Sequence, residues 1–111
     1  MSSRALACRP TYYAGTPDMQ IFNNNAYEVV SYEKYCKMLD NAKKNKFAYP
    51  AINVVSESSA NAVLQALAEA KSDGIIQVST GGGEFASGQA VKDAALGAIS
   101  IARHVHLVAD R

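Results

Sequence analysis

The first regular series of apolar residues has helical spacing and begins directly after Ser31, a residue that favours the N-cap position. Glu33 would lie in the first turn, where the helix dipole favours an acid. Lysines gather at the other end, and we interpret them as a solvated helix end rather than an anion-binding site. The apolar members of the series are Tyr32, Tyr35, Leu39 and Ala42.

Residues 47–55 form a short apolar run with β-branched residues near its end, which predicts a buried strand of a parallel sheet. Pro50 lacks an amide hydrogen, so it should lie at the beginning of the strand or at a bulge. Asn53 is a polar amide between apolar neighbours. A buried amide needs hydrogen-bond partners, so Asn53 either bonds to backbone or points into a site.

A second helix and a second strand follow the same order. Serines at positions 56, 58 and 59 supply N-cap candidates, and Gly74 suits a position with positive φ after the helix. The helix would bury the stripe Ala60, Val63, Leu64, Leu67 and Ala68. Residues 75–78 form a short buried strand that ends at Ser79, and we expect flexible loop over residues 80–85.

The last helix is predicted over about 91–110, with Gly97 and Ala98 permitting close packing. Its expected apolar face is Leu96, Ile99, Ala102, Val105, Val108 and Ala109. Strands that alternate with helices indicate an α/β fold of parallel βαβ units with right-handed crossovers. Ligands bind at the carboxyl ends of the strands in such sheets, which is where Asn53 and Ser79 lie.

Residues 1–30 have no comparable pattern, and we expect a poorly ordered tail of unclear role there. Arg4 and Arg9 precede the first acid, Asp18, so an organelle-targeting segment is the alternative interpretation. A secretory signal is not expected, because no apolar core follows the charges. We assign no chemistry to Cys8 in this segment.

Composition narrows the class of protein without identifying it. The chain has 111 residues, of which 49% are hydrophobic, and its formal net charge is +1. This predicts one globular domain and neither a nucleic-acid-binding protein nor a membrane-spanning one. Two cysteines make neither a disulfide framework nor a zinc ribbon, so an intracellular, cytoplasmic setting is the default expectation.

Other candidate chemistry is weak when it is judged by spacing. The glycines at 81–83 match neither a Walker loop nor a dinucleotide fingerprint, and a plain structural turn is an equal alternative to a phosphate cradle. His104 and His106 are two residues apart on a predicted helix, so they cannot share a metal. Glu84 and Asp93 are not assigned as an acid/base pair, because the sequence does not give their geometry.

In combination, several sequence segments resemble those of the class II, zinc-dependent fructose-bisphosphate aldolases. The similarity covers about Ser31 to Arg111 and leaves the first thirty residues unmatched. Its most specific parts are Phe47-Ala48-Tyr49-Pro50-Ala51-Ile52-Asn53-Val54 and Gly74-Ile75-Ile76-Gln77-Val78-Ser79-Thr80-Gly81-Gly82. It continues through Gly88, Val91-Lys92, Leu96-Gly97-Ala98-Ile99 and His104-Val105-His106. Tagatose-bisphosphate aldolases are relatives that these phrases do not exclude.

The resemblance implies a dimeric (β/α)8 barrel in which Zn²⁺ assists the reversible cleavage of fructose 1,6-bisphosphate. The products are dihydroxyacetone phosphate and glyceraldehyde 3-phosphate, in glycolysis and gluconeogenesis. Asn53 matches the asparagine of the family's first strand, near the triose-phosphate pocket. Ser79 matches the serine of its second strand, which contacts substrate. Both are therefore expected to bind substrate.

The chain also departs from the family. Such a barrel needs roughly 250 residues, so this chain would hold only its N-terminal βα units. The family's zinc ligands and catalytic aspartate belong to a His-x-Asp-His-Cys phrase and later strands, which we expect beyond residue 111. Thr80 stands where many relatives have Asn. We therefore expect residues 31–111 to be an inactive portion of an aldolase. The alternative is a stand-alone module that binds a phosphorylated metabolite without catalysis.

Overall fold

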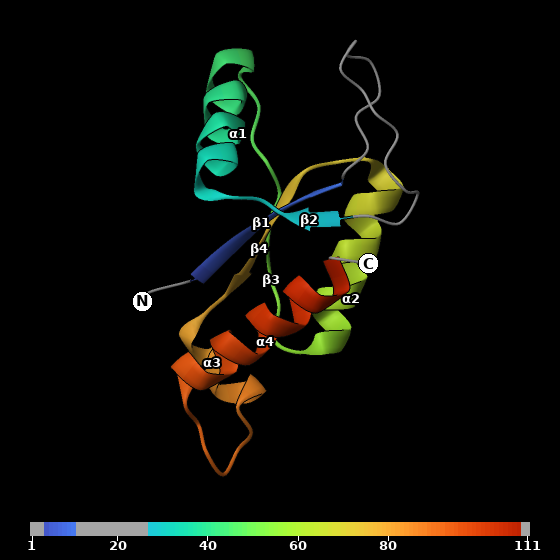
Figure 1. Ribbon diagram of the computed structural model, residues 1–111. Coiled ribbons are helices and arrows are strands. Elements are labelled where there is room, and N and C mark those ends of the chain that lie inside the picture. The colour runs from blue at the N-terminus through green and yellow to red at the C-terminus, as the bar shows by residue number, and fades with distance from the viewer. Residues whose placement is uncertain (1–3, 11–26, 110–111) are drawn as a thin grey trace.

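The computed structural model describes residues 4–10 and 27–109, which form a four-stranded sheet with two long helices packed on one side (Figure 1). The strands are β1 (Arg4–Pro10), β2 (Tyr27–Val29), β3 (Ala51–Asn53) and β4 (Gly74–Val78). The helices are α1 (Tyr32–Asn45), α2 (Glu57–Ala70), α3 (Thr80–Ala86) and α4 (Ala94–Ala109).

The sheet contains both parallel and antiparallel pairs, in the order β2-β1-β4-β3. β3 and β4 are parallel and are joined by α2, which confirms the predicted βαβ unit. β1 pairs antiparallel with both β4 and β2. These two strands lie in segment 1–30, where no strand was predicted, because distant pairing leaves little trace in local spacing. The rest of that expected tail (1–3 and 11–26), with any targeting signal in it, lies outside the described residues.

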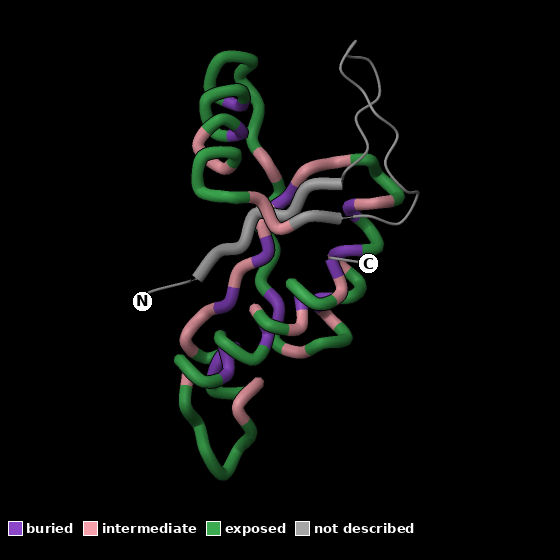
Figure 2. Tube along the Cα trace, viewed as in Figure 1, coloured by how far each residue is buried: buried purple, intermediate pink, exposed green. Residues whose placement is uncertain are grey.

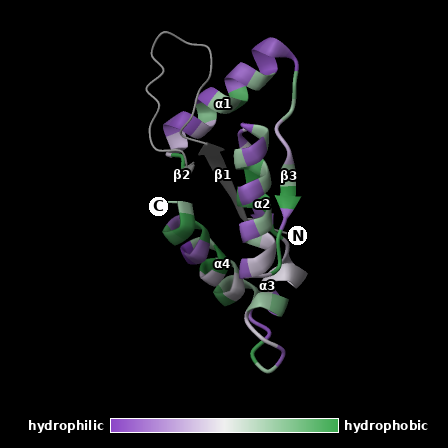
Figure 3. Cartoon of the chain, turned by 90° about the vertical axis from the view of Figure 1, so that its right-hand side faces the viewer, coloured by the Kyte–Doolittle hydropathy of each residue, from purple (hydrophilic) through white to green (hydrophobic). Residues whose placement is uncertain are grey.

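The predicted first helix is present as α1, and its ends are those that the sequence indicated. The Ser31 side chain accepts a hydrogen bond from the Lys34 amide, and Glu33 lies in the first turn. Lys46 ends the helix in the left-handed conformation. α1 projects away from the sheet in both views and carries much of the hydrophilic colouring in Figure 3.

The strand predicted over residues 47–55 is shorter and more exposed than expected. β3 spans only Ala51–Asn53, and all three of its residues are exposed. Pro50 lies directly before it, as predicted, and its carbonyl accepts a hydrogen bond from the amide of Ile75. The expectation of burial was wrong because, among the described residues, β3 pairs with β4 along one edge and with no strand along the other.

α2 begins with a capping box between Ser56 and Ser59, which confirms the predicted serine caps. The role predicted for Gly74 was wrong. Lys71 takes the left-handed conformation at the helix end, whereas Gly74 lies in β4 without positive φ. A Cβ on Gly74 would lie 2.5 Å from Cδ2 of Leu67, so close packing explains this glycine.

The loop predicted over residues 80–85 is instead a helix, α3, which begins after Ser79. The expectation of flexible backbone was wrong because two of its glycines, Gly82 and Gly83, are buried in close packing. α4 begins at Ala94, where the Asp93 carboxylate accepts a hydrogen bond from the Leu96 amide.

The buried face of α4 differs from the predicted one. Val105 and Ala109 are buried as predicted, but Leu96 is 50% exposed and Ile99 is 38% exposed. Ile101, which was not predicted, is buried. α4 is apolar around most of its circumference, so periodicity did not identify which side faces the sheet. Position 110, the predicted end of the helix, lies outside the described residues.

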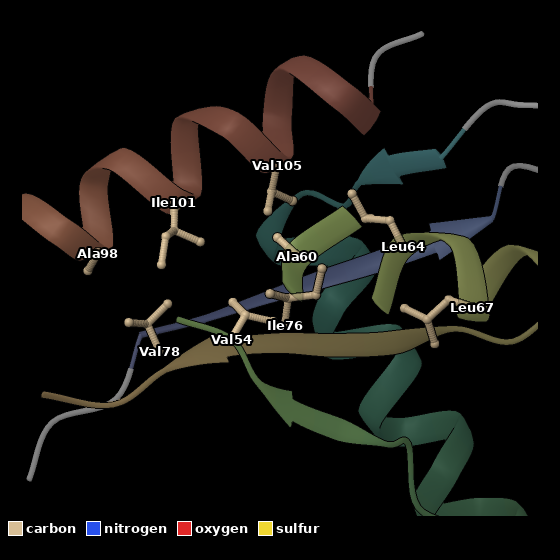
Figure 4. Packing of buried hydrophobic residues seen from close by; sticks show 9 residues of the cluster. All are labelled: Val54, Ala60, Leu64, Leu67, Ile76, Val78, Ala98, Ile101 and Val105. Carbon is tan, nitrogen blue, oxygen red and sulfur yellow. The ribbon is translucent and has the colours of Figure 1, made fainter. Parts of the chain in front are cut away.

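The core lies between the sheet and the helices α2 and α4. β4 alternates strictly, with Gly74, Ile76 and Val78 buried and the residues between them half-buried. Figure 2 shows that burial is concentrated in this region, and Figure 4 shows the packing. The cluster consists of Val54, Ala60, Leu64, Leu67, Ile76, Val78, Ala98, Ile101 and Val105.

Candidate functional site

Three polar side chains share one face of the sheet at the carboxyl ends of β3 and β4. Asn53 is the last residue of β3, and its register partner in β4 is Gln77. Paired residues of neighbouring strands project to the same face, and so do residues two apart in one strand. Asn53, Gln77 and Ser79 therefore lie on the face opposite to that of Ile76 and Val78, which point into the core.

Asn53 occupies an exposed position rather than the buried one that its apolar neighbours suggested. Among the described residues, no side-chain or backbone group forms a hydrogen bond with the side-chain amide of Asn53. The backbone of Val54 instead donates to the Gln77 carbonyl over 2.9 Å and continues the strand pairing. Of the two interpretations left open, an amide bonded to backbone is not found among the described residues, and an amide that binds a ligand stays a prediction.

Ser79 caps the helix that follows β4. Its Oγ accepts a hydrogen bond from the Gly82 amide over 3.1 Å, and the residue is half-buried. A serine hydroxyl has one donor hydrogen and two acceptor lone pairs, so the cap uses only part of its capacity. The same side chain can therefore cap α3 and donate a hydrogen bond toward the face that carries Asn53.

Gly82 brings the ends of the two strands together. A Cβ at this position would lie 3.2 Å from Oγ of Ser79 and 3.3 Å from the carbonyl oxygen of Val54. A side chain here would press on the cap and on the backbone directly after Asn53. Close packing thus explains Gly82, whereas a Cβ on Gly81 would meet nothing within 4 Å.

Gln77 is the polar residue of this site that the sequence analysis did not single out. It lies one position from Ile76 and Val78 in a run that we interpreted simply as a buried strand. The overlooked signal was alternation, since a strand that buries Ile76 and Val78 turns Gln77 and Ser79 to the other face.

The other candidates lie away from this face. His104 Nε2 in α4 is 2.8 Å from Oδ1 of Asn61 in α2, so this histidine links two helices. His106 is exposed. Asp93 caps α4 through its carboxylate, and Glu84 is exposed on α3.

Cys36 lies in α1 and is half-buried. Its thiol forms a hydrogen bond with the Tyr32 hydroxyl, and this contact raises the pKa of Tyr32 above its ordinary value. Both residues belong to the helix that projects away from the sheet, so this pair is separate from the strand ends (Figure 1).

The described part of the chain contains no cluster of side chains that could hold a metal ion. No three His, Cys, Asp or Glu side chains come together there. The described helices also include none that is long and apolar enough to span a membrane.

The sequence is similar to that of one family of known enzymes. The family model for fructose-bisphosphate aldolase class-II matches residues 33–111. The fructose-bisphosphate aldolase of Streptomyces coelicolor is 54% identical over 79 residues, which are 71% of this chain and 23% of that protein. The enzyme of the same name from Mycobacterium leprae is 52% identical over 77 residues, or 69% of this chain and 22% of that protein. That of Campylobacter jejuni is 48% identical over 82 residues, 73% of this chain and 23% of that protein. The chain thus spans less than a quarter of the length of these relatives.

Proposed function

Because the chain belongs to the class-II fructose-bisphosphate aldolase family, we propose that it supplies part of the substrate-binding wall of such an enzyme. The reaction is the reversible aldol cleavage of fructose 1,6-bisphosphate to dihydroxyacetone phosphate and glyceraldehyde 3-phosphate, in glycolysis and gluconeogenesis. The observation that carries the proposal is the position of Asn53, Gln77 and Ser79 on one face at the carboxyl ends of parallel strands. In barrels built from βα units, that end of the strands forms the active site.

We assign substrate binding to Asn53 and Ser79. The Asn53 amide has two N–H donors without partners among the described residues, and a sugar phosphate presents hydroxyl, carbonyl and phosphate oxygens as acceptors. The Ser79 hydroxyl would donate a hydrogen bond while its oxygen continues to cap α3. These groups would orient the substrate, and they do not transfer protons in this proposal.

The family resemblance also implies Zn²⁺, which polarises the substrate carbonyl when it is bound. The described residues do not fit this ion, because they bring no three potential ligands together. We therefore derive no step through zinc from this chain and place the ligands outside its described residues. We also propose that the 111-residue chain alone does not cleave fructose 1,6-bisphosphate.

A chimera tests this proposal directly. Residues 33–111 would replace the matching segment of the Streptomyces coelicolor enzyme, with which they are 54% identical. We expect zinc-dependent cleavage of fructose 1,6-bisphosphate by the chimera and none by the isolated chain. A chimera that folds and binds zinc but lacks activity would contradict the assignment, as would chelator-sensitive turnover by the isolated chain.

The exposed amide of Asn53 supports a second candidate function. A stand-alone module could hold a phosphorylated metabolite on the same face without catalysis. Titration calorimetry of the isolated chain with dihydroxyacetone phosphate separates the two candidates. Micromolar binding that Asn53→Ala abolishes would favour the module, and absence of binding would favour a role within a complete barrel.

The remaining properties follow from the family in the same way. For the complete enzyme we propose a (β/α)8 barrel, a homodimer and a cytoplasmic location. Its partners would be sugar bisphosphates and triose phosphates, with neither nucleic acid nor membrane involved. The parallel β3–α2–β4 unit and the helix α4 on the same side of the sheet support the barrel, because they repeat the layering of its βα units.

A further inference from the structure

α4 has a second apolar side, which the core does not use. Figure 4 shows Ala98, Ile101 and Val105 pointing from α4 toward the sheet, and Ile101 and Val105 are almost fully buried. On the opposite side of the helix, Leu96 is 50% exposed and Leu107 is 67% exposed. A helix that packs on one side only normally turns polar and charged residues outward. The part of the chain that the structure describes therefore leaves apolar surface on α4 largely uncovered.

The exposed residues on this side recur at the spacing of a contact between two helices. Successive intervals of four, three and four residues keep side chains in one line along a helix, and this is the heptad spacing at which two helices pack. We call this line of exposed side chains the outer seam. It consists of Leu96, Ser100, Arg103 and Leu107. The outer seam thus has the pattern of one half of a two-helix interface.

The order of residues along the outer seam makes it complementary to itself. If a second copy of α4 lies antiparallel, with the two-fold axis midway between positions 101 and 102, Leu96 faces Leu107 of the second copy. Ser100 then faces Arg103 of the second copy, and the guanidinium can donate a hydrogen bond to the serine hydroxyl. A parallel pair would instead bring the two Arg103 side chains together, and like charges repel. A two-fold interface needs one surface that complements itself, and the antiparallel arrangement meets this condition.

We propose that two copies of this chain associate through the outer seam, with their α4 helices antiparallel. The outer seam lies on the side of α4 away from the sheet, whereas Asn53 and Ser79 lie on the other face of the sheet. Association therefore leaves the strand ends open. The inference does not depend on the proposed catalytic role, and it is compatible with a complete barrel, because that side of each helix is the outside of the barrel.

Sedimentation of the full 111-residue chain, over about 10 μM to 1 mM, tests the surface. A contact of about three helical turns is small, so we expect a weak dimer with a dissociation constant on the order of 0.1 mM. Leu107→Asp should raise this constant by about a hundredfold or more, because the leucine occurs twice in a two-fold interface. Leu39→Asp is the matched control, because Leu39 is 42% exposed on α1 and lies outside the outer seam. Circular dichroism checks that both variants keep the wild-type fold.

Variants of Ser100 test the antiparallel orientation. Ser100→Glu should lower the dissociation constant by about threefold to tenfold, because a carboxylate then faces Arg103 of the second copy. Ser100→Arg should raise it by a similar factor, since two arginines then face each other. Adding Arg103→Glu to Ser100→Arg should restore the dimer, because the charges are exchanged and opposite again. A parallel pair predicts the reverse for Ser100→Glu, in which glutamates would face each other.

Three outcomes would overturn the proposal. The first is a wild-type chain that is monomeric at 1 mM, and the second is a Leu107→Asp chain that associates as strongly as the wild type. The third is a shift in the same direction for Ser100→Glu and Ser100→Arg, which would contradict the antiparallel pairing. Cleavage of fructose 1,6-bisphosphate does not enter these measurements, so failure here is distinguishable from failure of the chimera.

Discussion

Gly97 of α4 lies so close to Gly83 of α3 that a Cβ on Gly97 would overlap the Gly83 carbonyl oxygen. Gly83 is equally restricted, because a Cβ there would overlap the carbonyl group of Ala94. Two glycines thus set the distance at which α3 and α4 pack. Their contact holds α3, which Ser79 caps, against the N-terminal end of α4.

We expect Gly97→Ala to destabilise the chain by about 1–3 kcal/mol, because the added methyl group must push the two backbones apart. Gly81→Ala is the matched control, since a Cβ at Gly81 would meet nothing within 4 Å. Alanine also favours a helix over glycine, so Gly81→Ala should be neutral or stabilising by up to about 1 kcal/mol. Urea unfolding followed by circular dichroism measures both, and equal effects would contradict this packing.

The capping box of α2 gives a second prediction about stability. The Ser56 hydroxyl accepts from the Ser59 amide, and the Ser59 hydroxyl accepts from the Ser56 amide. Ser56→Ala should lower the free energy of unfolding by about 1 kcal/mol. Ser58→Ala, at an exposed position between them in sequence, should change it by less than about 0.5 kcal/mol. A larger loss at position 58 than at position 56 in the same unfolding assay would be inconsistent with the cap.

The contact between His104 and Asn61 links α4 to α2 and should appear as an energetic coupling. In a double-mutant cycle with alanine at both positions, we expect a coupling of about 0.5–1.5 kcal/mol in the free energy of unfolding. His106→Ala combined with Asn61→Ala is the control cycle, because His106 is exposed and lies on another side of α4. Coupling in the control cycle but not in the first would refute a specific contact.

The sequence predicted those elements whose signals are local. The Ser31 and Ser56 caps satisfy free amides within one turn, so the side chains that begin α1 and α2 are encoded beside the helices themselves. The predictions that were wrong concern features set by tertiary packing. Glycines at 81–83 suggested a loop, although Gly83 is required by its contact with α4. The pairing of β1 with β4 joins segments about 70 residues apart, which no local pattern records.

The candidate site was predicted in part for the same reason. Asn53 and Ser79 stood out because each is a polar residue at the end of an apolar strand. Gln77 did not, since its position opposite Asn53 depends on the register of two strands. The exposure of Asn53 was also missed, because no local pattern shows that β3 pairs with one strand, β4, in the part of the chain that the structure describes.

The roles of Asn53 and Ser79 can be separated by the variants chosen at each position in the active chimera. Asn53→Ala should lower kcat/KM for fructose 1,6-bisphosphate by about tenfold to a hundredfold, because a hydrogen bond to a charged substrate is lost. Its stability should hardly change, since the amide has no partner among the described residues. Gln65→Ala is the control, because this exposed side chain on α2 donates a hydrogen bond to Glu69 and to no other described residue.

At Ser79, glycine and alanine distinguish helix capping from substrate binding. Alanine at an N-cap costs about 1 kcal/mol, whereas glycine costs only a few tenths. If the hydroxyl binds substrate, Ser79→Gly and Ser79→Ala should lose kcat/KM equally, by about tenfold or more, although Ser79→Gly remains the more stable variant. If Ser79 serves only as the cap of α3, Ser79→Gly should retain nearly all activity. Steady-state kinetics and thermal unfolding of the same two preparations therefore decide whether the Ser79 hydroxyl acts on the substrate or on α3 alone.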